Sequence, residues 1–293
     1  MKVVLAVDQS PSAETVLSGF LSRPWPAKTQ VCVLNIVDLY KYFLGTEYIQ
    51  PAEAIELKSA IDFTGSLADR LIEKGMESTY QVFQGYPVTG IVDFAKEWKA
   101  DLILIGSQRH SAVSRFLLGS VAKGVIRHAD CAVEIVRPAR NRTDGAMKVL
   151  LATDGSEYSV AAAHSIAARP WPDGTEVRII SVVEYELPAI DPWYASTDVI
   201  QQINRERTQT ADEAVAVCSQ IVEGGKLKIR KEVASGSIKS AILDTAEDWD
   251  ADLIVVGSHG RRGITRLLMG SVAESVAIGA HCSVEVVRKP RAS

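Results

Sequence analysis

The chain has 293 residues, enough for one large domain or two of ordinary size, because single hydrophobic cores stop growing near about 250 to 300 residues. Hydrophobic residues make up 47% and charged residues 23%, and 20 Gly with 11 Pro are too few for a low-complexity or collagen-like chain. Up to residue 140 the chain has 15 Lys and Arg residues and 15 Asp and Glu residues, and beyond residue 140 it has 17 and 21. This charge excludes a basic nucleic-acid-binding protein.

The first apolar run, Met1-Lys-Val-Val-Leu-Ala-Val-Asp8, is too short for a signal peptide, and no stretch reaches the roughly 18 apolar residues of a membrane span. We therefore expect a soluble, cytoplasmic protein that does not contact membranes. Four cysteines without CxxC spacing indicate structural thiols in a reducing compartment: Cys32, Cys131, Cys218 and Cys282.

The chain repeats itself. Met1-Lys-Val-Val-Leu-Ala-Val-Asp8 returns as Met147-Lys-Val-Leu-Leu-Ala-Thr-Asp154, and 14 of 38 positions match at an offset of 146. Residues 80–137 match their copy at 25 of 58 positions, at an offset of 151, which places a five-residue insertion in the second copy. We predict a first domain over 1–140, a polar linker over 141–146 and a second domain over 147–293.

Within each copy, short β-rich runs alternate with helical ones. In the second copy the pattern predicts strands at 148–153, 176–183, 228–234, 252–256 and 283–287, and helices at 157–168, 197–223, 238–249 and from about 271. The apolar run of residues 253–256 is typical of a strand buried on both faces, as in parallel sheets covered by helices. Each copy is therefore predicted to be an α/β domain with a five-stranded, doubly wound parallel sheet.

A glycine-rich segment follows the fourth strand of the second copy. Gly257 and Gly260 are separated by two residues, and nine residues later Gly270-Ser271 opens a helix. Bare backbone can cradle phosphate oxygens, and a helix start adds unpaired N–H groups and the positive end of a dipole. The alternative is a simple turn followed by a capping box, which Ser271-Val-Ala-Glu274 fits.

Asp154 ends the first strand of the second copy, and ligands of doubly wound sheets bind beyond the carboxyl ends of the strands. If strands one and four are neighbours, Asp154 and Gly257 reach the same crevice, where the carboxylate can accept a ribose hydroxyl or hold a divalent cation. The alternative role for Asp154 is N-cap of the following helix.

On these residues the chain resembles a tandem universal stress protein of the ATP-binding subgroup, from Met1 to Arg137 and again from Met147 to Arg288. The histidines have no metal-ligand spacing, so we expect no metal other than Mg²⁺. The resemblance implies an adenine nucleotide alpha-hydrolase-like fold with strand order 3-2-1-4-5, and ATP as ligand with or without Mg²⁺. It places Asp154 near the ribose and the Val183 backbone beside adenine. It also implies pairing of fifth strands about a two-fold axis, in a homodimer or within one chain as a pseudo-dimer. The implied second-domain nucleotide site comprises Asp154, Gly155, Val183, Gly257, His259, Gly260, Gly270, Ser271 and Val272.

The first copy departs from the motif, because Arg109 stands where Gly260 does and Gln9 where Gly155 does. An arginine closes the open backbone, although its guanidinium can pair with phosphate, so this copy has either lost or weakened binding or kept it through an arginine contact. The weaker first-domain site comprises Asp8, Val37, Gly106, Arg109, Gly119, Ser120 and Val121.

Two functions from different classes fit the sequence. The first is a stress-response regulatory protein that binds an adenine nucleotide mainly in its second domain and signals to a protein partner. The second is a slow metal-dependent ATP hydrolase in which Asp154 places the metal and Arg261-Arg262 stabilise charge, although no P-loop string occurs and no catalytic residue is assigned. A ligand-free scaffold is the third. Aromatic residues within 39–50 and 185–200 are expected to form a lid over the nucleotide, a surface for a partner, or ordinary packing beneath a long loop. Trp25 and Trp171 are predicted to close the first helix of each copy.

Overall fold

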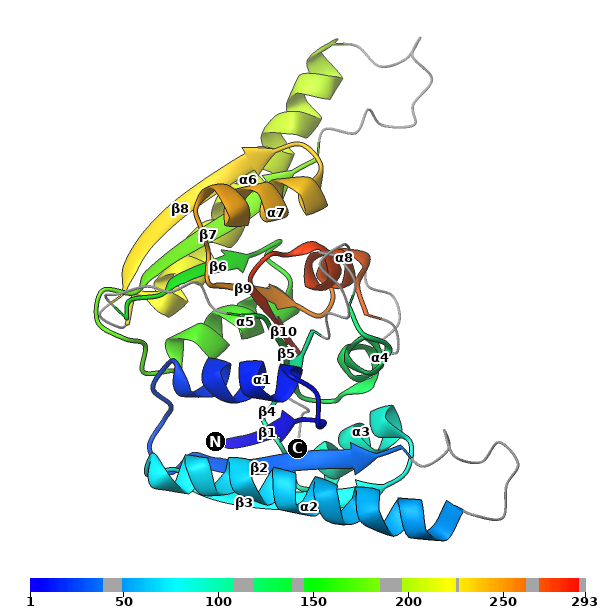
Figure 1. Ribbon diagram of the computed structural model, residues 1–293. Helices are drawn as coiled ribbons and strands as arrows, with labels where there is room; N and C mark the ends of the chain where they lie inside the picture. Colours follow the sequence, from blue (N-terminus) through cyan, green and yellow to red (C-terminus); the bar gives the residue numbers. More distant parts are fainter. Residues whose placement is uncertain are drawn as a thin grey trace. The chain divides into compact units, whose positions relative to one another are not determined.

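The computed structural model describes residues 1–38, 49–107, 118–138, 145–184, 197–224, 227–261 and 269–289 (Figure 1). The chain divides into two compact units, Met1–Asn141 and Arg142–Ser293, and each is described by itself. The predicted linker at 141–146 lies for the most part outside the described residues, as do both aromatic segments, Arg109 and Arg262.

Strands and helices alternate along each unit. The first contains β1 (Lys2–Ala6), α1 (Ser12–Leu21), β2 (Gln30–Val37), α2 (Ile49–Glu73), β3 (Glu77–Gln84), α3 (Pro87–Glu97), β4 (Leu102–Gly106), α4 (Ser120–His128) and β5 (Ala132–Val136). The second contains β6 (Lys148–Ala152), α5 (Glu157–Ala167), β7 (Glu176–Val183), α6 (Thr197–Val222), β8 (Lys228–Ser235), α7 (Ile238–Asp248), β9 (Leu253–Gly257), α8 (Ser271–Gly279) and β10 (Ser283–Val287). The predicted boundaries of the strands and helices in the second unit are confirmed to within one residue.

The strands of each unit are parallel throughout. Their order is β3-β2-β1-β4-β5 in the first unit and β8-β7-β6-β9-β10 in the second, which confirms the doubly wound α/β class and the 3-2-1-4-5 order within each unit. In this order β7 and β8 lie on one side of β6, and β9 and β10 lie on the other, so the strand order switches at the β6–β9 pair. Ala152 of β6 and Val256 of β9 are partners in register. The loops that follow these two strands therefore leave the sheet side by side.

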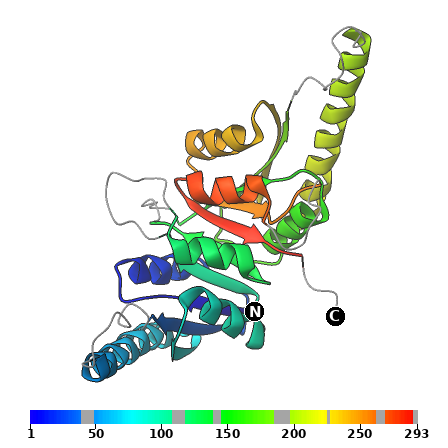
Figure 2. The same cartoon turned by 90° about the vertical axis from the view of Figure 1, so that its right-hand side faces the viewer.

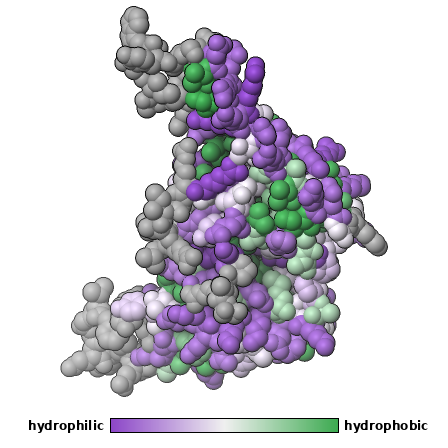
Figure 3. Space-filling view, turned by 180° about the vertical axis from the view of Figure 1, so that it is seen from behind, coloured by the Kyte–Doolittle hydropathy of each residue, from purple (hydrophilic) through white to green (hydrophobic). Residues whose placement is uncertain are grey.

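Two helical layers bury each sheet. In the first unit Val3 and Leu5 of β1 pack with Phe20 of α1 and Leu71 of α2. Helices α3 and α4 pack together on the other face of this unit's sheet (Figure 2). The second unit repeats this arrangement with α5 and α6 against β6, β7 and β9. Hydrophilic side chains cover most of the surface seen in Figure 3, with apolar ones gathered in a few patches. No described helix is both long and apolar enough to cross a membrane.

The repeated Arg-Pro-Trp-Pro segment closes the first helix of each unit. Trp25 Nε1 donates to the Phe20 carbonyl and Trp171 Nε1 to the Ile166 carbonyl, each at 2.8 Å, so the predicted role of both tryptophans is confirmed. The arginine of the segment serves a purpose that the sequence did not reveal.

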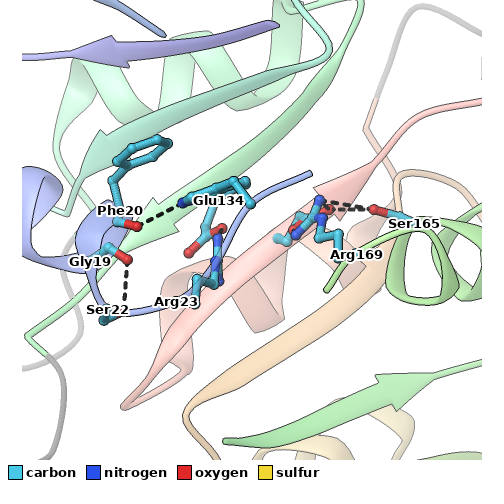
Figure 4. A network of polar contacts seen from close by, with 9 residues as sticks. Gly19, Phe20, Ser22, Arg23, Glu134, Ser165 and Arg169 are labelled. Carbon is cyan, nitrogen blue, oxygen red and sulfur yellow. Dashed lines mark hydrogen bonds and ion pairs between the residues drawn. The ribbon is translucent and has the colours of Figure 1, made fainter. Parts of the chain in front are cut away.

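Each of these arginines forms a buried ion pair with a glutamate of its own unit's fifth strand. Arg23 pairs with Glu134 of β5, and the two side chains are only 3% and 2% exposed (Figure 4). Arg169 holds Glu285 of β10 with two bonds of 2.6 and 2.7 Å, and Ser165 donates to the same carboxylate at 3.0 Å. A buried charge is tolerated only when it is paired, so the repeated arginine and the strand-five glutamate require each other.

The cysteines are all free thiols, and Cys32, Cys218 and Cys282 are buried. Burial raises the pKa of Cys32 and of Cys218 above the ordinary thiol value, partly offset by hydrogen bonds with Thr79 and Thr153 respectively. A thiol held in its protonated form is a weak nucleophile, which fits the predicted structural role of these two residues.

Candidate functional site

The candidate site of the second unit lies where the loops after β6 and β9 meet. Asp154 tethers these loops to each other. Its Oδ1 accepts the Ser156 backbone N–H at 3.0 Å and its Oδ2 accepts the Arg261 backbone N–H at 2.8 Å. A carboxylate that accepts two N–H bonds is held in one orientation, so Asp154 fixes the start of the glycine-rich loop.

The N-cap of α5 is Ser156, not Asp154, so the alternative capping role of Asp154 is wrong. The Ser156 hydroxyl accepts the Ser159 backbone N–H at 3.3 Å and donates to the His259 carbonyl at 3.4 Å. The helix cap is thus a second tie between the two loops. Asp154 lies two residues too early to reach the helix N–H groups, because the chain still has to turn at Gly155, whose φ is +75°.

Each glycine of the loop is packed against a neighbour. A Cβ on Gly257 would stand 2.7 Å from the Tyr158 carbonyl carbon, in the first turn of α5, and one on Gly260 would stand 2.8 Å from Asp154 Oδ2. A Cβ on Gly270 would stand 3.1 Å from the Ser258 carbonyl oxygen, which also accepts the Gly270 N–H at 2.8 Å. The returning end of the loop is therefore fastened beside its beginning, with no room for side chains between them.

Helix α8 begins at Ser271 with Gly270 as N-cap and without a side-chain cap bond, so the predicted capping box with Glu274 is wrong. The Glu274 N–H is the donor that reaches the Gly270 carbonyl, at 3.0 Å. The N–H groups of Ser271, Val272 and the next residue precede this first helical bond and have no partner within the helix. They point outward from the helix start, where Ser271 is exposed and Val272 half-buried.

His259 is buried within the site and is only 6% exposed. Its Nδ1 shares a hydrogen bond of 3.0 Å with the Ser258 hydroxyl, and its ring packs against Tyr158 with 4.9 Å between centroids. The buried Nε2 has no hydrogen-bond partner among the described residues. The ring therefore packs against Tyr158 of α5, and its buried Nε2 is a polar atom without a partner in the part of the chain that the structure describes.

Val183, the predicted adenine neighbour, ends β7 and is buried. Its carbonyl accepts the Gly236 N–H at 3.0 Å, just as Val37 in the first unit accepts the Gly85 N–H at 3.1 Å. The contacts described above bring together six of the predicted residues at the meeting of the two loops: Asp154, Gly155, Gly257, His259, Gly260 and Gly270. Val183 ends the neighbouring strand β7, and none of these contacts includes it.

The first unit builds the corresponding loop differently. Asp8 Oδ1 accepts the Ser10 backbone N–H at 3.1 Å, and the Ser10 and Ser12 hydroxyls point to the same oxygen. Gly106 packs against Ser12, with only 2.8 Å between a Cβ placed on the glycine and the serine Cβ. Gly119 is N-cap of α4, followed by the exposed Ser120 and the half-buried Val121. Arg109 and the loop around it lie outside the described residues.

Sequence reasoning missed the way in which Arg261 completes the site of the second unit. The Arg261 guanidinium lies over Gly155, and a Cβ on that glycine would stand 2.5 Å from its Nη2. In the first unit Gln9 stands in place of Gly155 and its Oε1 accepts the Ser59 hydroxyl of α2 at 2.9 Å. The sequence feature that could have indicated this arrangement is the glycine after Asp154, because glycine adopts a positive φ readily and leaves space for a neighbouring side chain. The described residues contain no cluster of three or more potential metal ligands.

Together, the fold and these loops define a class: a chain of two doubly wound α/β units, of which the second carries a glycine-lined loop joined to a helix start. The sequence model of the universal stress protein family matches residues 1–137 and 146–288, so the chain belongs to that family.

Individual relatives agree with this assignment. The universal stress protein MJ0531 of Methanocaldococcus jannaschii is 38% identical over 157 residues, which is 52% of this chain and 88% of that protein. The universal stress protein Mb2028c of Mycobacterium bovis is 29% identical over 233 residues, which is 76% of this chain and 71% of that protein. A crystal structure of a universal stress protein from Archaeoglobus fulgidus superimposes with a TM-score of 0.69 at 21% identity, over 99% of this chain and 98% of that one, and shows a shared fold.

Proposed function

We propose that the protein is a regulatory protein of a stress response that binds an adenine nucleotide, ATP with or without Mg²⁺, mainly in its second unit. The observation that carries the proposal is the packing of Gly257, Gly260 and Gly270. Side chains on these residues would collide with the first turn of α5, with Asp154 in the loop after β6, or with the glycine-rich loop's own backbone. Such packing leaves bare backbone at the carboxyl edge of the sheet, which is where doubly wound folds bind ligands.

In this proposal the phosphates lie against the start of α8. The donors are the N–H groups of Ser271 and Val272, which have no partner within the helix, and the exposed Ser271 hydroxyl, and the helix dipole favours the negative charge of the phosphates. Asp154 positions the loop through its bond to the Arg261 N–H and faces the ribose, as the family resemblance implies. When bound, Mg²⁺ would neutralise part of the phosphate charge. Adenine beside the Val183 backbone remains a prediction.

The first unit is proposed to bind the nucleotide weakly. Arg109 replaces the second loop glycine there, and Gln9 replaces the glycine of the positive-φ turn. The Gln9 side chain accepts a hydrogen bond from Ser59 of α2, and Gln9 does not take the positive φ of Gly155, so the loop after β1 follows a different path from the loop after β6. A protein partner, association into homodimers, pairing of fifth strands and cytoplasmic localisation likewise stay predictions.

A metal-dependent hydrolase is the less favoured alternative. Both carboxylate oxygens of Asp154 already accept backbone N–H bonds, so a metal at Asp154 would compete with the bonds that shape the loop. Rapid, metal-dependent phosphate release that disappears in Asp154→Ala would favour the hydrolase over the regulatory protein.

The direct test is isothermal titration calorimetry of the full chain with ATP. Gly260→Glu, which places bulk and negative charge beside Asp154, is expected to abolish binding while the circular dichroism spectrum stays unchanged. Gly224→Glu is the matched control, because a Cβ there meets no atom within 4 Å. Equal ATP affinity in the wild type and Gly260→Glu would contradict the proposed phosphate loop.

A further inference from the structure

Arg261 has a fixed backbone and a side chain that turns back across the site. Its N–H donates to Asp154 Oδ2 at 2.8 Å, which holds the residue at the entrance of the loop. A Cβ built on Gly155 would stand 2.5 Å from Arg261 Nη2, 3.5 Å from Arg261 Cζ and 3.1 Å from the Cβ of Ala214 in α6. The guanidinium, a glycine and an alanine therefore share one small volume, which we call the guanidinium slot.

The guanidinium slot exists because two positions in the second unit are small. Helices α2 and α6 align at the offset of 151, since the buried Leu67 and Leu71 then match the buried Cys218 and Val222. At this offset Phe63 of the first unit stands where Ala214 does, and it is partly buried against that unit's core.

The first copy differs at all three positions that form the slot. Gln9 replaces Gly155, Phe63 replaces Ala214 and His110 replaces Arg261. The small residues and the arginine thus occur together in the copy with the intact glycine motif and are replaced together in the other. This joint replacement indicates that the slot serves the arginine.

The guanidinium carries a charge that the described residues leave unneutralised. Arg261 is exposed, and none of the described residues forms an ion pair or a hydrogen bond with its guanidinium. The carboxylate of Asp154, which binds the Arg261 backbone, is engaged by the N–H groups of Ser156 and Arg261. An arginine stays protonated at all ordinary pH values and binds phosphate in a bidentate manner, so it is suited to an anion arriving at this loop.

We propose that Arg261 sets the specificity of the second unit for nucleotides with more phosphates, with the guanidinium held in the slot beside Gly155 and Ala214 until it pairs with the phosphate chain. This inference rests on the proposed nucleotide binding and goes beyond it by naming the residue that discriminates ATP from AMP. Any cation close to the phosphate chain favours the more highly charged ligand, because the attraction grows with the number of negative charges.

The experiment compares ATP, ADP and AMP by titration calorimetry of the full-length wild type and Arg261→Gln. The variant is expected to bind ATP about 10- to 100-fold more weakly and AMP within about twofold of wild type, the range for one charge-assisted contact. Arg261→Lys keeps the charge but not the fork, and should fall between the two. Arg230→Gln is the matched control, since Arg230 lies in β8 with a side chain 63% exposed.

Salt dependence gives a second measurement that a purely structural arginine would not change. The ATP affinity of wild type should fall more steeply with added NaCl than that of Arg261→Gln, because one charged contact is missing in the variant. Equal losses for all three nucleotides, or identical salt slopes, would overturn the specificity role. A wild type that binds none of the nucleotides would refute the proposed function itself, whereas normal wild-type binding with an unaffected Arg261→Gln would refute only this inference.

Discussion

Gly260→Ala tests whether the close approach of Gly260 to Asp154 shapes the loop. The added methyl group would stand 2.8 Å from Asp154 Oδ2, whereas ordinary van der Waals contact begins near 3.4 Å. The aspartate side chain is short and its Oδ1 is held by the Ser156 N–H, so moving the carboxylate aside weakens the 2.8 Å bond from the Arg261 N–H. The loop thus loses the bond that fixes its start.

The size of the effect follows from this one bond. A hydrogen bond to a charged group contributes about 1.5 to 3 kcal/mol, and the half-buried position of Asp154 places its bond near the lower end. About 1.5 kcal/mol corresponds to a roughly tenfold loss of ATP affinity. The free energy of unfolding should fall by at most about 1.5 kcal/mol, because the same bond joins two loops of the folded protein.

Titration calorimetry measures the affinity, and amide hydrogen exchange at Arg261 reports on the loop without any ligand. We expect weaker ATP binding together with faster exchange of the Arg261 amide. Gly224→Ala should change neither, since its added methyl group meets no atom within 4 Å. Wild-type affinity and wild-type exchange in Gly260→Ala would refute the packing argument.

Three further predictions concern stability. Arg169→Ala leaves the buried Glu285 carboxylate without its partner and should lower the free energy of unfolding by about 3 to 5 kcal/mol, measured by urea titration. Arg70→Ala breaks an exposed pair with Glu14 and should cost less than about 1 kcal/mol, so similar losses for both variants would contradict the burial argument. Ser156→Ala removes a cap bond and should cost about 1 kcal/mol of thermal stability, while Ser237→Ala, at a helix N-cap without a side-chain bond, should cost a few tenths; the reverse order would refute the assigned cap. Because burial raises the thiol pKa of Cys32 and Cys218, their contribution to stability is complete below the ordinary pKa of 9.0 and is lost as pH rises from that value through the raised pKa of the folded state. Unfolding titrations should show declining stability above pH 9.0, and neither thiol should react readily with iodoacetamide at pH 8 in the native protein.

The order of elements could be predicted from the sequence because the chain contains its own comparison. The two copies align closely in their strands, and the positions of the apolar runs are enough to place β6 to β10 within one residue. The parallel sheet follows from runs that are apolar on both faces, as in residues 253–256. The same reasoning located the loop glycines, since their spacing is visible without any structure.

Interactions between distant residues could not be predicted in this way. Glu134 and Glu285 interrupt otherwise apolar strands, and only the fold shows that Arg23 and Arg169 neutralise them. The capping box at Ser271 failed because Gly270 takes the N-cap position.

The tether made by Asp154 belongs to the same category. Its bond to the Arg261 N–H spans 107 residues and depends on β6 and β9 being neighbours. The sequence shows that both residues follow strands but not that one carboxylate binds both loops. The guanidinium slot likewise requires α6 to be placed against the loop after β6.

The central claim is that one adenine nucleotide binds in the second unit. The most direct test is to denature freshly purified protein, separate the released small molecules by chromatography and quantify them per chain, with calorimetry on nucleotide-free protein as a complement. We predict one adenine nucleotide per chain. Two per chain would contradict weak binding by the first unit, and no released nucleotide together with no calorimetric ATP binding would contradict the proposed function.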